Sequence, residues 1–283
     1  MSMTFDVPVA EGALSRARQL YANLQWGIAT VVRAPRRRTN PAWRRAGRLV
    51  PYGIMLLGVI VASMFYVDGW VAEIVLRRPD WLRTVFEGLT EFGRSGWFLV
   101  PTGLILLAVA FFSSRAMAHV DRLVLAAIGF RVGFLFLAIA LPSLFVTVVK
   151  RIIGRARPLV GEQIDPLLFQ QWVWRPDYAS LPSGHATTAF AAAVAIGVLW
   201  PRLRVAMIIY AFLIALSRVV LDAHFFSDVL AGAIVGVVGA LLVRDRFTER
   251  RLVFSVGLDG RVEARSGLSF AHVKTVARKV FAP

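Results

Sequence analysis

The sequence contains no cysteine, few acidic residues and only four histidines. Without cysteine, disulfide bonds, thiolate metal sites and cysteine nucleophiles are all excluded. Charged residues make up only 18% of the 283 residues, whereas 57% are hydrophobic, and the mean hydropathy is +0.64. A chain so apolar and so poor in charge has the composition of a membrane protein rather than that of a soluble domain.

The charges that are present are mostly positive. Lysine and arginine number 33 against 17 aspartates and glutamates, which leaves a formal net charge of +16. Such an excess could indicate nucleic-acid binding, but no recognised nucleic-acid-binding motif accompanies it. The arginines instead lie in short segments that flank apolar runs, as in proteins whose loops set membrane orientation. We therefore expect membrane lipids, and no nucleic acid, as partners.

Six apolar runs predict an all-α protein with six transmembrane helices. They cover residues 49–67, 97–112, 123–149, 186–200, 205–216 and 229–243. The first would span roughly 28 Å as a helix, enough for the hydrocarbon layer. The last three are short unless their helices begin inside the neighbouring polar motifs. Between the first two runs, residues 68–96 predict short helices at the membrane interface.

This pattern divides the chain into a basic N-terminal arm (residues 1–48), a membrane domain (49–243) and a basic tail (244–283). We expect no secretory signal in the arm. Its apolar residues recur every three or four positions, which predicts an amphipathic helix that lies on an anionic leaflet or pairs with a partner; they are Leu14, Ala17, Tyr21, Leu24, Ile28 and Val31. In the tail, Asp259-Gly260 predicts a hairpin turn, and residues 270–280 predict a short amphipathic helix. A small-residue face at Gly232, Gly236 and Gly239 predicts close packing of the sixth helix.

Arginine-rich segments at 33–48 and from Arg244 onward predict that both termini are cytoplasmic, because cytoplasmic loops are enriched in these residues. With six spans, residues 150–185 and 217–228 then lie on the opposite side of the membrane. These segments carry cations of their own, among them Arg151 and Arg155, against the general tendency. We expect this exception if those cations bind phosphate rather than set orientation.

Three polar motifs interrupt the second half of the chain. The first is Lys150 with Arg157-Pro158, the second is Pro182-Ser183-Gly184-His185, and the third is Ser217-Arg218 with His224 and Asp228. The second precedes an apolar run, so a helix should begin at or just after Ser183, with free amides that attract an anion. Taken singly, each motif has an ordinary explanation as a helix cap, interfacial charges or a helical side-chain pair.

Together, Lys-x6-Arg-Pro, Pro-Ser-Gly-His and Ser-Arg-x5-His-x3-Asp resemble the three signature motifs of the type 2 phosphatidic acid phosphatase (PAP2) superfamily. This superfamily contains integral-membrane lipid phosphatases that are related to the vanadium haloperoxidases. The resemblance is close over residues 150–228 and holds only in outline for the flanking spans. It implies a helical core like that of the haloperoxidases and phosphatase activity without a metal ion or another cofactor.

The resemblance also implies a role for each motif residue. The catalytic residues would be His224 as the nucleophile that forms a phosphohistidine, Asp228 as the group that fixes its tautomer, and His185 as the general acid and base. The phosphate would be bound by Lys150, Arg157 and Arg218 and by the backbone amides of Ser183 and Gly184. His119 and His272 match no motif, and two histidines near the site are too few for a zinc centre.

The motifs recognise a phosphate and leave the rest of the substrate open. Undecaprenyl diphosphate, phosphatidylglycerol phosphate, phosphatidate and the lipid A phosphates all remain candidates. Exposed apolar residues between the first two motifs, such as Trp172 and Trp174, are equally consistent with a wall for a lipid tail and with interfacial anchors. We expect a lipid phosphatase of the inner membrane with its active site on the periplasmic face. A lipid phosphotransferase and a non-catalytic transporter or scaffold are the alternatives; six intact motif residues argue against a scaffold.

Overall fold

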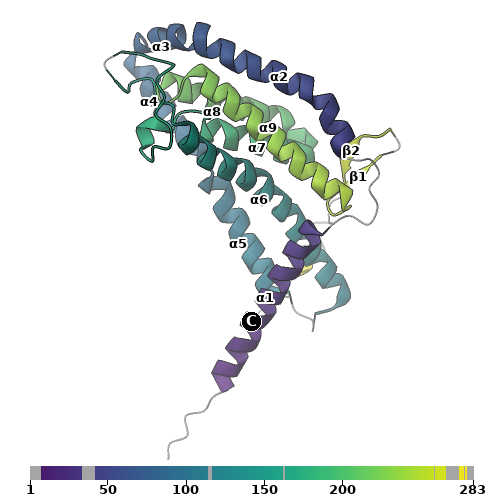
Figure 1. Cartoon of the computed structure of the whole chain (residues 1–283). Coiled ribbons are helices and arrows are strands. Elements are labelled where there is room, and N and C mark those ends of the chain that lie inside the picture. The colour runs from purple at the N-terminus through teal and green to yellow at the C-terminus, as the bar shows by residue number, and fades with distance from the viewer. Residues whose placement is uncertain are drawn as a thin grey trace, which may run out of the picture. The chain divides into compact units, whose positions relative to one another are not determined.

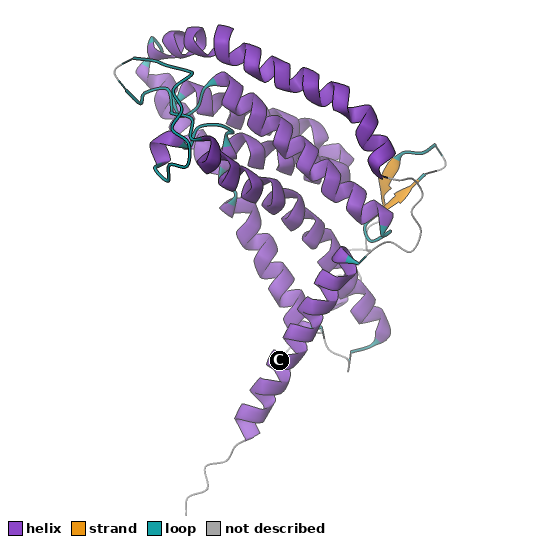
Figure 2. Cartoon of the chain, in the orientation of Figure 1, coloured by secondary structure: helices purple, strands orange, loops and turns teal. Residues whose placement is uncertain are grey.

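Helices make up most of the fold (Figures 1 and 2). The computed structural model describes residues 8–33, 42–113, 117–161, 163–257, 259–265, 274–276 and 278. In chain order the elements are α1 (Pro8–Val32), α2 (Ala42–Tyr66), α3 (Asp68–Leu76), α4 (Asp80–Thr90), η1 (Glu91–Gly93), α5 (Gly96–Phe112), α6 (His119–Ile153), η2 (Pro176–Tyr178), α7 (Gly184–Leu199), η3 (Pro201–Leu203), α8 (Arg204–Val220), α9 (Phe226–Glu249), β1 (Phe254–Val256) and β2 (Val262–Ala264). The all-α class predicted from the sequence is thus confirmed, with one short hairpin added.

The chain forms two compact units, each of which is described by itself. The larger comprises residues 37–100 and 135–245 and is called the motif unit, because it contains all three polar motifs. The smaller comprises residues 1–36, 101–134 and 246–283 and is called the terminal unit. The predicted division at residues 48 and 243 remains a prediction.

Several helices are long and apolar enough to cross a bilayer, which makes the chain a multi-pass membrane protein. Within the described residues, four continuous segments qualify: 80–112, 119–153, 201–220 and 226–249. A fifth span arises if α2 and α3, which meet at an angle of 50°, are counted together. Helix α7 is apolar but has only 16 residues. Each of the six apolar runs is helical, and the count of six membrane crossings stays a prediction.

Small side chains form the centre of the motif unit. Helices α7 and α8 pack against each other through Ala189, Ala193, Ala211 and Ile214, all of which are buried. Because alanine projects only one methyl group, the two helix backbones can approach closely. The alanine-rich run after Gly184 is therefore a packing surface.

Helix α9 approaches the backbone of α7 even more closely, through two glycines. A Cβ atom at Gly232 would lie 2.4 Å from the carbonyl oxygen of Ser183, and one at Gly236 would lie 2.4 Å from that of Thr187. Gly239 lies against the side chain of Pro142 in α6, where a Cβ atom would lie 2.7 Å from the proline Cβ. The predicted small-residue face is thus confirmed, and it brings the start of α9 beside the start of α7.

The segment between α6 and α7 begins at a glycine that has no room for a side chain. Gly154 has φ of +65°, and a Cβ there would lie 1.8 Å from the carbonyl oxygen of Gln170. The segment then folds back on itself: the Gln170 amide donates to the Gly154 carbonyl at 2.7 Å, and the Ser180 amide donates to the Arg155 carbonyl at 3.1 Å. This segment is therefore a compact layer rather than an open loop.

In the terminal unit, α1 uses polar side chains to hold the end of α5. The Asn23 amide donates to the carbonyl oxygens of Ala110 and Ser113, each at 2.8 Å. Much of the predicted apolar stripe remains uncovered, with Tyr21 64% exposed. The predicted hairpin is confirmed, since β1 and β2 pair in antiparallel fashion around Gly260, whose φ is +76°. Of the predicted tail helix, the structure describes only residues 274–276 and 278, and these are helical; the rest of it, and part of the arginine collar, lie outside the described residues.

The close contact between α7 and α9 predicts a selective effect on stability. Replacing Gly236→Ala should lower the free energy of unfolding by about 1–3 kcal/mol, because the new methyl group meets backbone atoms that cannot rotate away. Gly58→Ala on α2 is the matched control, since a Cβ there meets nothing within 4 Å. Thermal unfolding in detergent, followed by tryptophan fluorescence, measures both variants. An equal midpoint for Gly236→Ala and the native chain would contradict the packing described.

Candidate active site

All the residues predicted for the site come together at one end of the motif unit. They lie where the helices end or begin: Lys150 in the last turn of α6, Arg157 in the following segment, Ser183, Gly184 and His185 at the start of α7, Arg218 in the last turn of α8, His224 in the next loop, and Asp228 in the first turn of α9. Because successive helices run in opposite directions, the ends of α6 and α8 meet the beginnings of α7 and α9.

The start of α7 faces the ammonium group of Lys150. Helix α7 begins at Gly184 with Ser183 as its N-cap, as predicted. A Cβ atom on Gly184 would lie 3.8 Å from Lys150 Nζ, so the lysine reaches over the first turn of the helix. The Ser183 amide donates at 2.9 Å to the carbonyl oxygen of Asp228, which ties this turn to α9. We expected this amide to bind phosphate; it is instead occupied by a backbone acceptor, because folding brings the start of α9 against it. An ammonium group and the positive end of a helix dipole here act on the same space.

His185 is held against a glycine that sequence reasoning did not single out. A Cβ on Gly93 would lie 2.8 Å from His185 Cδ2 and 2.6 Å from a methyl carbon of Ile214. Only a residue without a side chain therefore allows the imidazole to take this position. Gly93 belongs to η1, far from the motifs in sequence, and nothing in its surroundings marks it as a site residue.

Arg218 is oriented by a hydroxyl group from α4. Its Nη1 donates to Thr90 Oγ1 at 2.6 Å, and the Ser217 hydroxyl donates to the same oxygen at 3.1 Å. Arg218 and Thr90 are both buried. A buried hydroxyl that accepts from a guanidinium restricts the direction in which the remaining donors point. Thr90 is a second contributor that the motifs do not reveal.

The loop that carries His224 is held in place by backbone hydrogen bonds and by an ion pair. The backbone amides of Ala223 and His224 both donate to the carbonyl oxygen of Arg218, at 3.1 and 3.2 Å. Asp222 adopts φ of +52° and forms an ion pair with Arg78 at 2.6 Å. The five residues between Arg218 and His224 thus form a tight reversal that places the imidazole beside the arginine.

Asp228 lies next to the His224 ring, with a serine hydroxyl close to both groups. His224 Nδ1 is 3.8 Å from Asp228 Oδ2, which is longer than a hydrogen bond. Ser180 Oγ donates to Asp228 Oδ2 at 2.5 Å and lies 3.4 Å from His224 Nδ1. The Phe225 amide also donates to Oδ2, at 2.9 Å. Ser180 therefore belongs to the site, although it precedes the second motif and carries no signal of its own.

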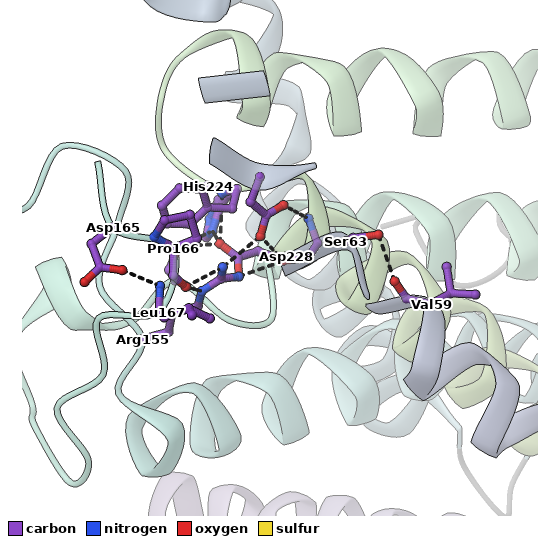
Figure 3. A network of polar contacts seen from close by, with 12 residues as sticks. Val59, Ser63, Arg155, Asp165, Pro166, Leu167, His224 and Asp228 are labelled. Carbon is purple, nitrogen blue, oxygen red and sulfur yellow. Dashed lines mark hydrogen bonds and ion pairs between the residues drawn. The ribbon is translucent and has the colours of Figure 1, made fainter. Parts of the chain in front are cut away.

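The other oxygen of Asp228 is bound by Arg155, which corrects one expectation. Arg155 is fully buried, and its Nη1 donates to Asp228 Oδ1 at 2.5 Å (Figure 3). Its Nη2 donates to Asp68 Oδ2 at 2.7 Å. We expected Arg155 to be one of the phosphate-binding cations. It is instead committed to two carboxylates, because folding places them on either side of its guanidinium.

The remaining cations keep donors that are buried but have no partner among the described residues. These atoms are Arg151 Nη1, Arg157 Nε and Arg218 Nε, and the Ser183 hydroxyl is in the same condition. Burial lowers the pKa of the Arg157 guanidinium, with Asp177 acting in the opposite direction. Several desolvated donors that have no acceptor within the described part of the chain form an environment in which an anion with several oxygens is strongly stabilised.

Two tryptophans of the segment between α6 and α7 are strongly exposed at its surface. Trp172 is 69% exposed and Trp174 is 79% exposed, and the Arg151 guanidinium lies 6.0 Å from the ring centre of Trp174. Anchoring at the headgroup layer and contact with a lipid tail both suit these positions.

Across the described ranges, no three histidine, aspartate or glutamate side chains are grouped so that they could hold a metal ion.

Residues 131–251 match the family model of the PAP2 superfamily. The chain is 32% identical over 232 residues to a lipid A 1-phosphatase of Rhizobium johnstonii, an alignment that covers 77% of this chain and 91% of the relative. It is 31% identical over 212 residues to a lipid A 1-phosphatase of Rhizobium etli, covering 72% of this chain and 87% of that protein.

Among solved structures, a PAP2-type phosphatidylglycerolphosphate phosphatase from Bacillus subtilis aligns with a TM-score of 0.48 and 25% identity, over 69% of this chain and 94% of that one. Aquifex aeolicus LpxE aligns with a TM-score of 0.44 and 25% identity, over 62% and 93% of the two chains. Helical spans, a cationic site and sequence relatives together define a membrane lipid phosphatase. The chain belongs to the PAP2 superfamily.

The surroundings of His224 predict that its ring is neutral over the physiological range. Burial lowers the pKa of this imidazole to about 4, although Asp228 beside it acts in the opposite direction. Since the shifted pKa lies below the usual value, we expect the ring to stay neutral on acidification to about pH 5. Imidazole NMR signals in detergent can test this, because the chain has four histidines and His224→Gln assigns the relevant signal. A midpoint at or above the ordinary histidine value would contradict the prediction.

Proposed function

We propose that this protein hydrolyses the 1-phosphate of lipid A at the periplasmic face of the inner membrane, through a phosphohistidine on His224. The observation that carries the chemistry is that the two histidines lie beside the predicted phosphate-binding cations: Lys150 Nζ reaches the first turn of α7, which carries His185, and the His224 amide donates to the carbonyl oxygen of Arg218 at 3.2 Å. The choice of lipid is supported by two relatives with that activity in their names, each aligned over most of its length.

In the proposed reaction, the cations and the start of α7 bind the phosphate. Arginine offers a planar pair of donors to two phosphate oxygens, and Lys150 adds a charge beside the amide of Gly184. Phosphoryl transfer depends mainly on positioning and on stabilising charge over the equatorial oxygens. Arg157 and Arg218 each keep an Nε that has no partner among the residues that the structure describes, and such donors are suited to this task without a metal ion.

His224 would attack phosphorus through Nε2 while its Nδ1 faces Asp228 and Ser180. A bond forms between nitrogen and phosphorus, and the bond from phosphorus to the lipid oxygen breaks. His185 gives a proton to the leaving oxygen, then takes one from the water that attacks the phosphohistidine. Cleavage of the phosphorus–nitrogen bond releases inorganic phosphate and restores both histidines.

Replacing each of the two histidines should impair the reaction in a different way. His224→Ala should abolish turnover and leave a folded protein, because the covalent intermediate cannot form. His185→Ala should slow both steps, and a substrate with an activated leaving group should partly rescue the first step, since that group needs no proton. Rapid-quench measurement of phosphoenzyme and free phosphate separates the steps. Substantial turnover by His224→Ala would remove this residue from the role of nucleophile.

The substrate and the independence from metal can be tested together. Purified protein in detergent, with excess EDTA, is given lipid A with a 1-phosphate, phosphatidate, phosphatidylglycerol phosphate and undecaprenyl diphosphate. We expect phosphate release in EDTA, with lipid A the best substrate by kcat/KM. A higher kcat/KM for another lipid would contradict the proposal that lipid A is the substrate. A complete loss that magnesium restores would overturn the metal-free mechanism. Labelled phosphate appearing on an added acceptor lipid would favour a transferase.

The location of the site rests on the distribution of arginine and lysine among the loops. We expect Gln163→Cys, in the exposed part of the segment after α6, to react with an impermeant maleimide on intact spheroplasts. Asp259→Cys, in the exposed hairpin turn, should react only after lysis. The chain has no cysteine of its own, so each variant carries a single reactive thiol. The reverse pattern would place the site on the cytoplasmic side and leave the chemistry untouched.

A further inference from the structure

A second buried aspartate, Asp68, lies behind the site at the break between α2 and α3. It is fully buried, and both of its oxygens are occupied. Oδ1 accepts from the backbone amide of Ser227 at 2.9 Å, and Oδ2 accepts from the Ser227 hydroxyl at 2.5 Å and from Arg155 Nη2 at 2.7 Å. None of the three sequence motifs includes Asp68.

The contact with Ser227 makes Asp68 a cap for another helix. Ser227 is in the first turn of α9, whose first amides lack partners within the helix. A carboxylate at this end is stabilised by the helix dipole and in turn holds the end of the helix in place. The next residue along α9 is Asp228, so the cap acts directly beside the group that faces His224.

Arg155 joins Asp68 to Asp228, and its guanidinium has no donor to spare. Nη1 donates to Asp228 Oδ1 and to the Ser227 hydroxyl, and Nη2 donates to Asp68 and to the carbonyl oxygen of Pro166 at 2.7 Å. Nε donates to the same carbonyl at 2.9 Å, as Figure 3 shows for Arg155 and Pro166. These contacts use all five N–H groups of an arginine.

The charges of this cluster do not cancel. One guanidinium lies between two carboxylates, all with fully buried side chains. If Asp68 were neutral, Arg155 would be paired with Asp228 alone and would offset the negative charge that faces the imidazole. With Asp68 ionised, a net negative charge remains beside His224 where low polarity strengthens its effect. That charge stabilises the imidazole ring as it becomes positive in forming the phosphohistidine.

We propose that Asp68 is a positioning residue for the phosphatase reaction. It acts through Arg155 and Ser227 to hold Asp228 in place and to keep its negative charge available to His224. This inference rests on the proposed function, in which His224 is the nucleophile. Because Ser227 and Arg155 occupy both of its oxygens, we assign Asp68 no contact with substrate. Its loss should therefore slow the chemical steps and leave substrate affinity nearly unchanged.

The test is Asp68→Asn, which preserves shape and removes the charge. We expect kcat for the best lipid of the panel to fall on the order of 10- to 100-fold, with KM changed by less than about threefold, because misplaced catalytic groups impair chemistry rather than binding. Ser63→Ala is the matched control. Ser63 is a buried polar residue of α2, shortly before Asp68 in the chain, and its hydroxyl donates to the carbonyl oxygen of Val59 in that same helix at 2.8 Å (Figure 3). The control should keep native kcat and KM.

The same substitution made in the Asp228→Asn variant distinguishes a positioning role from general structural damage. In Asp228→Asn, the group through which Asp68 acts is already neutral, so adding Asp68→Asn should change kcat by less than about twofold. A loss of the same size in both backgrounds would overturn the proposal, as would native kcat in Asp68→Asn alone. If Asp68→Asn is not recovered folded, Ser227→Ala removes one of the links and is judged by the same two criteria.

The proposed function can fail independently of this inference. Turnover that persists in His224→Ala would contradict the phosphohistidine mechanism, regardless of the result for the Asp68 variants. Phosphate release by the native chain and by Ser63→Ala, with none by His224→Ala, would uphold that mechanism. In that case, the Asp68 variants alone decide whether Asp68 is a positioning residue.

Discussion

The structure of the site depends on one buried guanidinium, that of Arg155. Removing a charge from water is expensive, and the cost is offset only when every donor finds an acceptor. Arg155 meets this condition with acceptors from three places in the chain: Asp68 at the start of α3, Pro166 in the segment after α6, and Ser227 with Asp228 in α9. Any separation of these elements would leave a buried charge without a partner, so the guanidinium holds the back of the site together.

Around this centre the cations divide into two kinds. Arg155 is saturated by carboxylates and carbonyl oxygens, whereas Arg151, Arg157 and Arg218 retain buried donors without partners among the described residues. Like charges brought together out of water repel one another, and an anion with several oxygens relieves that repulsion. The saturated arginine gives the site its shape, and the unsaturated ones are the cations that we propose for phosphate binding. Glycine and hydroxyl neighbours such as Gly93 and Thr90 then set the directions of the side chains.

Much of the fold followed from local patterns. Hydropathy located the helices, Ser183 marked the start of α7, and Asp259-Gly260 marked a hairpin. The contributors that sequence reasoning missed are all remote from the motifs or carry no pattern. Thr90 lies 128 residues before Arg218, and Asp68 lies 87 residues before Arg155. No periodicity or spacing connects such pairs, because they meet only through the packing of helices that are themselves far apart in sequence.

By itself, the sequence indicated that the chain is helical and apolar, because hydropathy and capping are properties of neighbouring residues. The grouping of eight motif residues into one predicted site came from the resemblance to the PAP2 motifs, not from local physics. Tertiary structure alone decided what each cation does. Arg155 and Arg157 are the same amino acid two positions apart in one basic cluster, and nothing local distinguishes them. Folding places two carboxylates against the first and leaves the Nε of the second without a partner among the described residues. The physical reason is that an arginine's role is set by the acceptors within reach of its donors, and those acceptors come from distant parts of the chain.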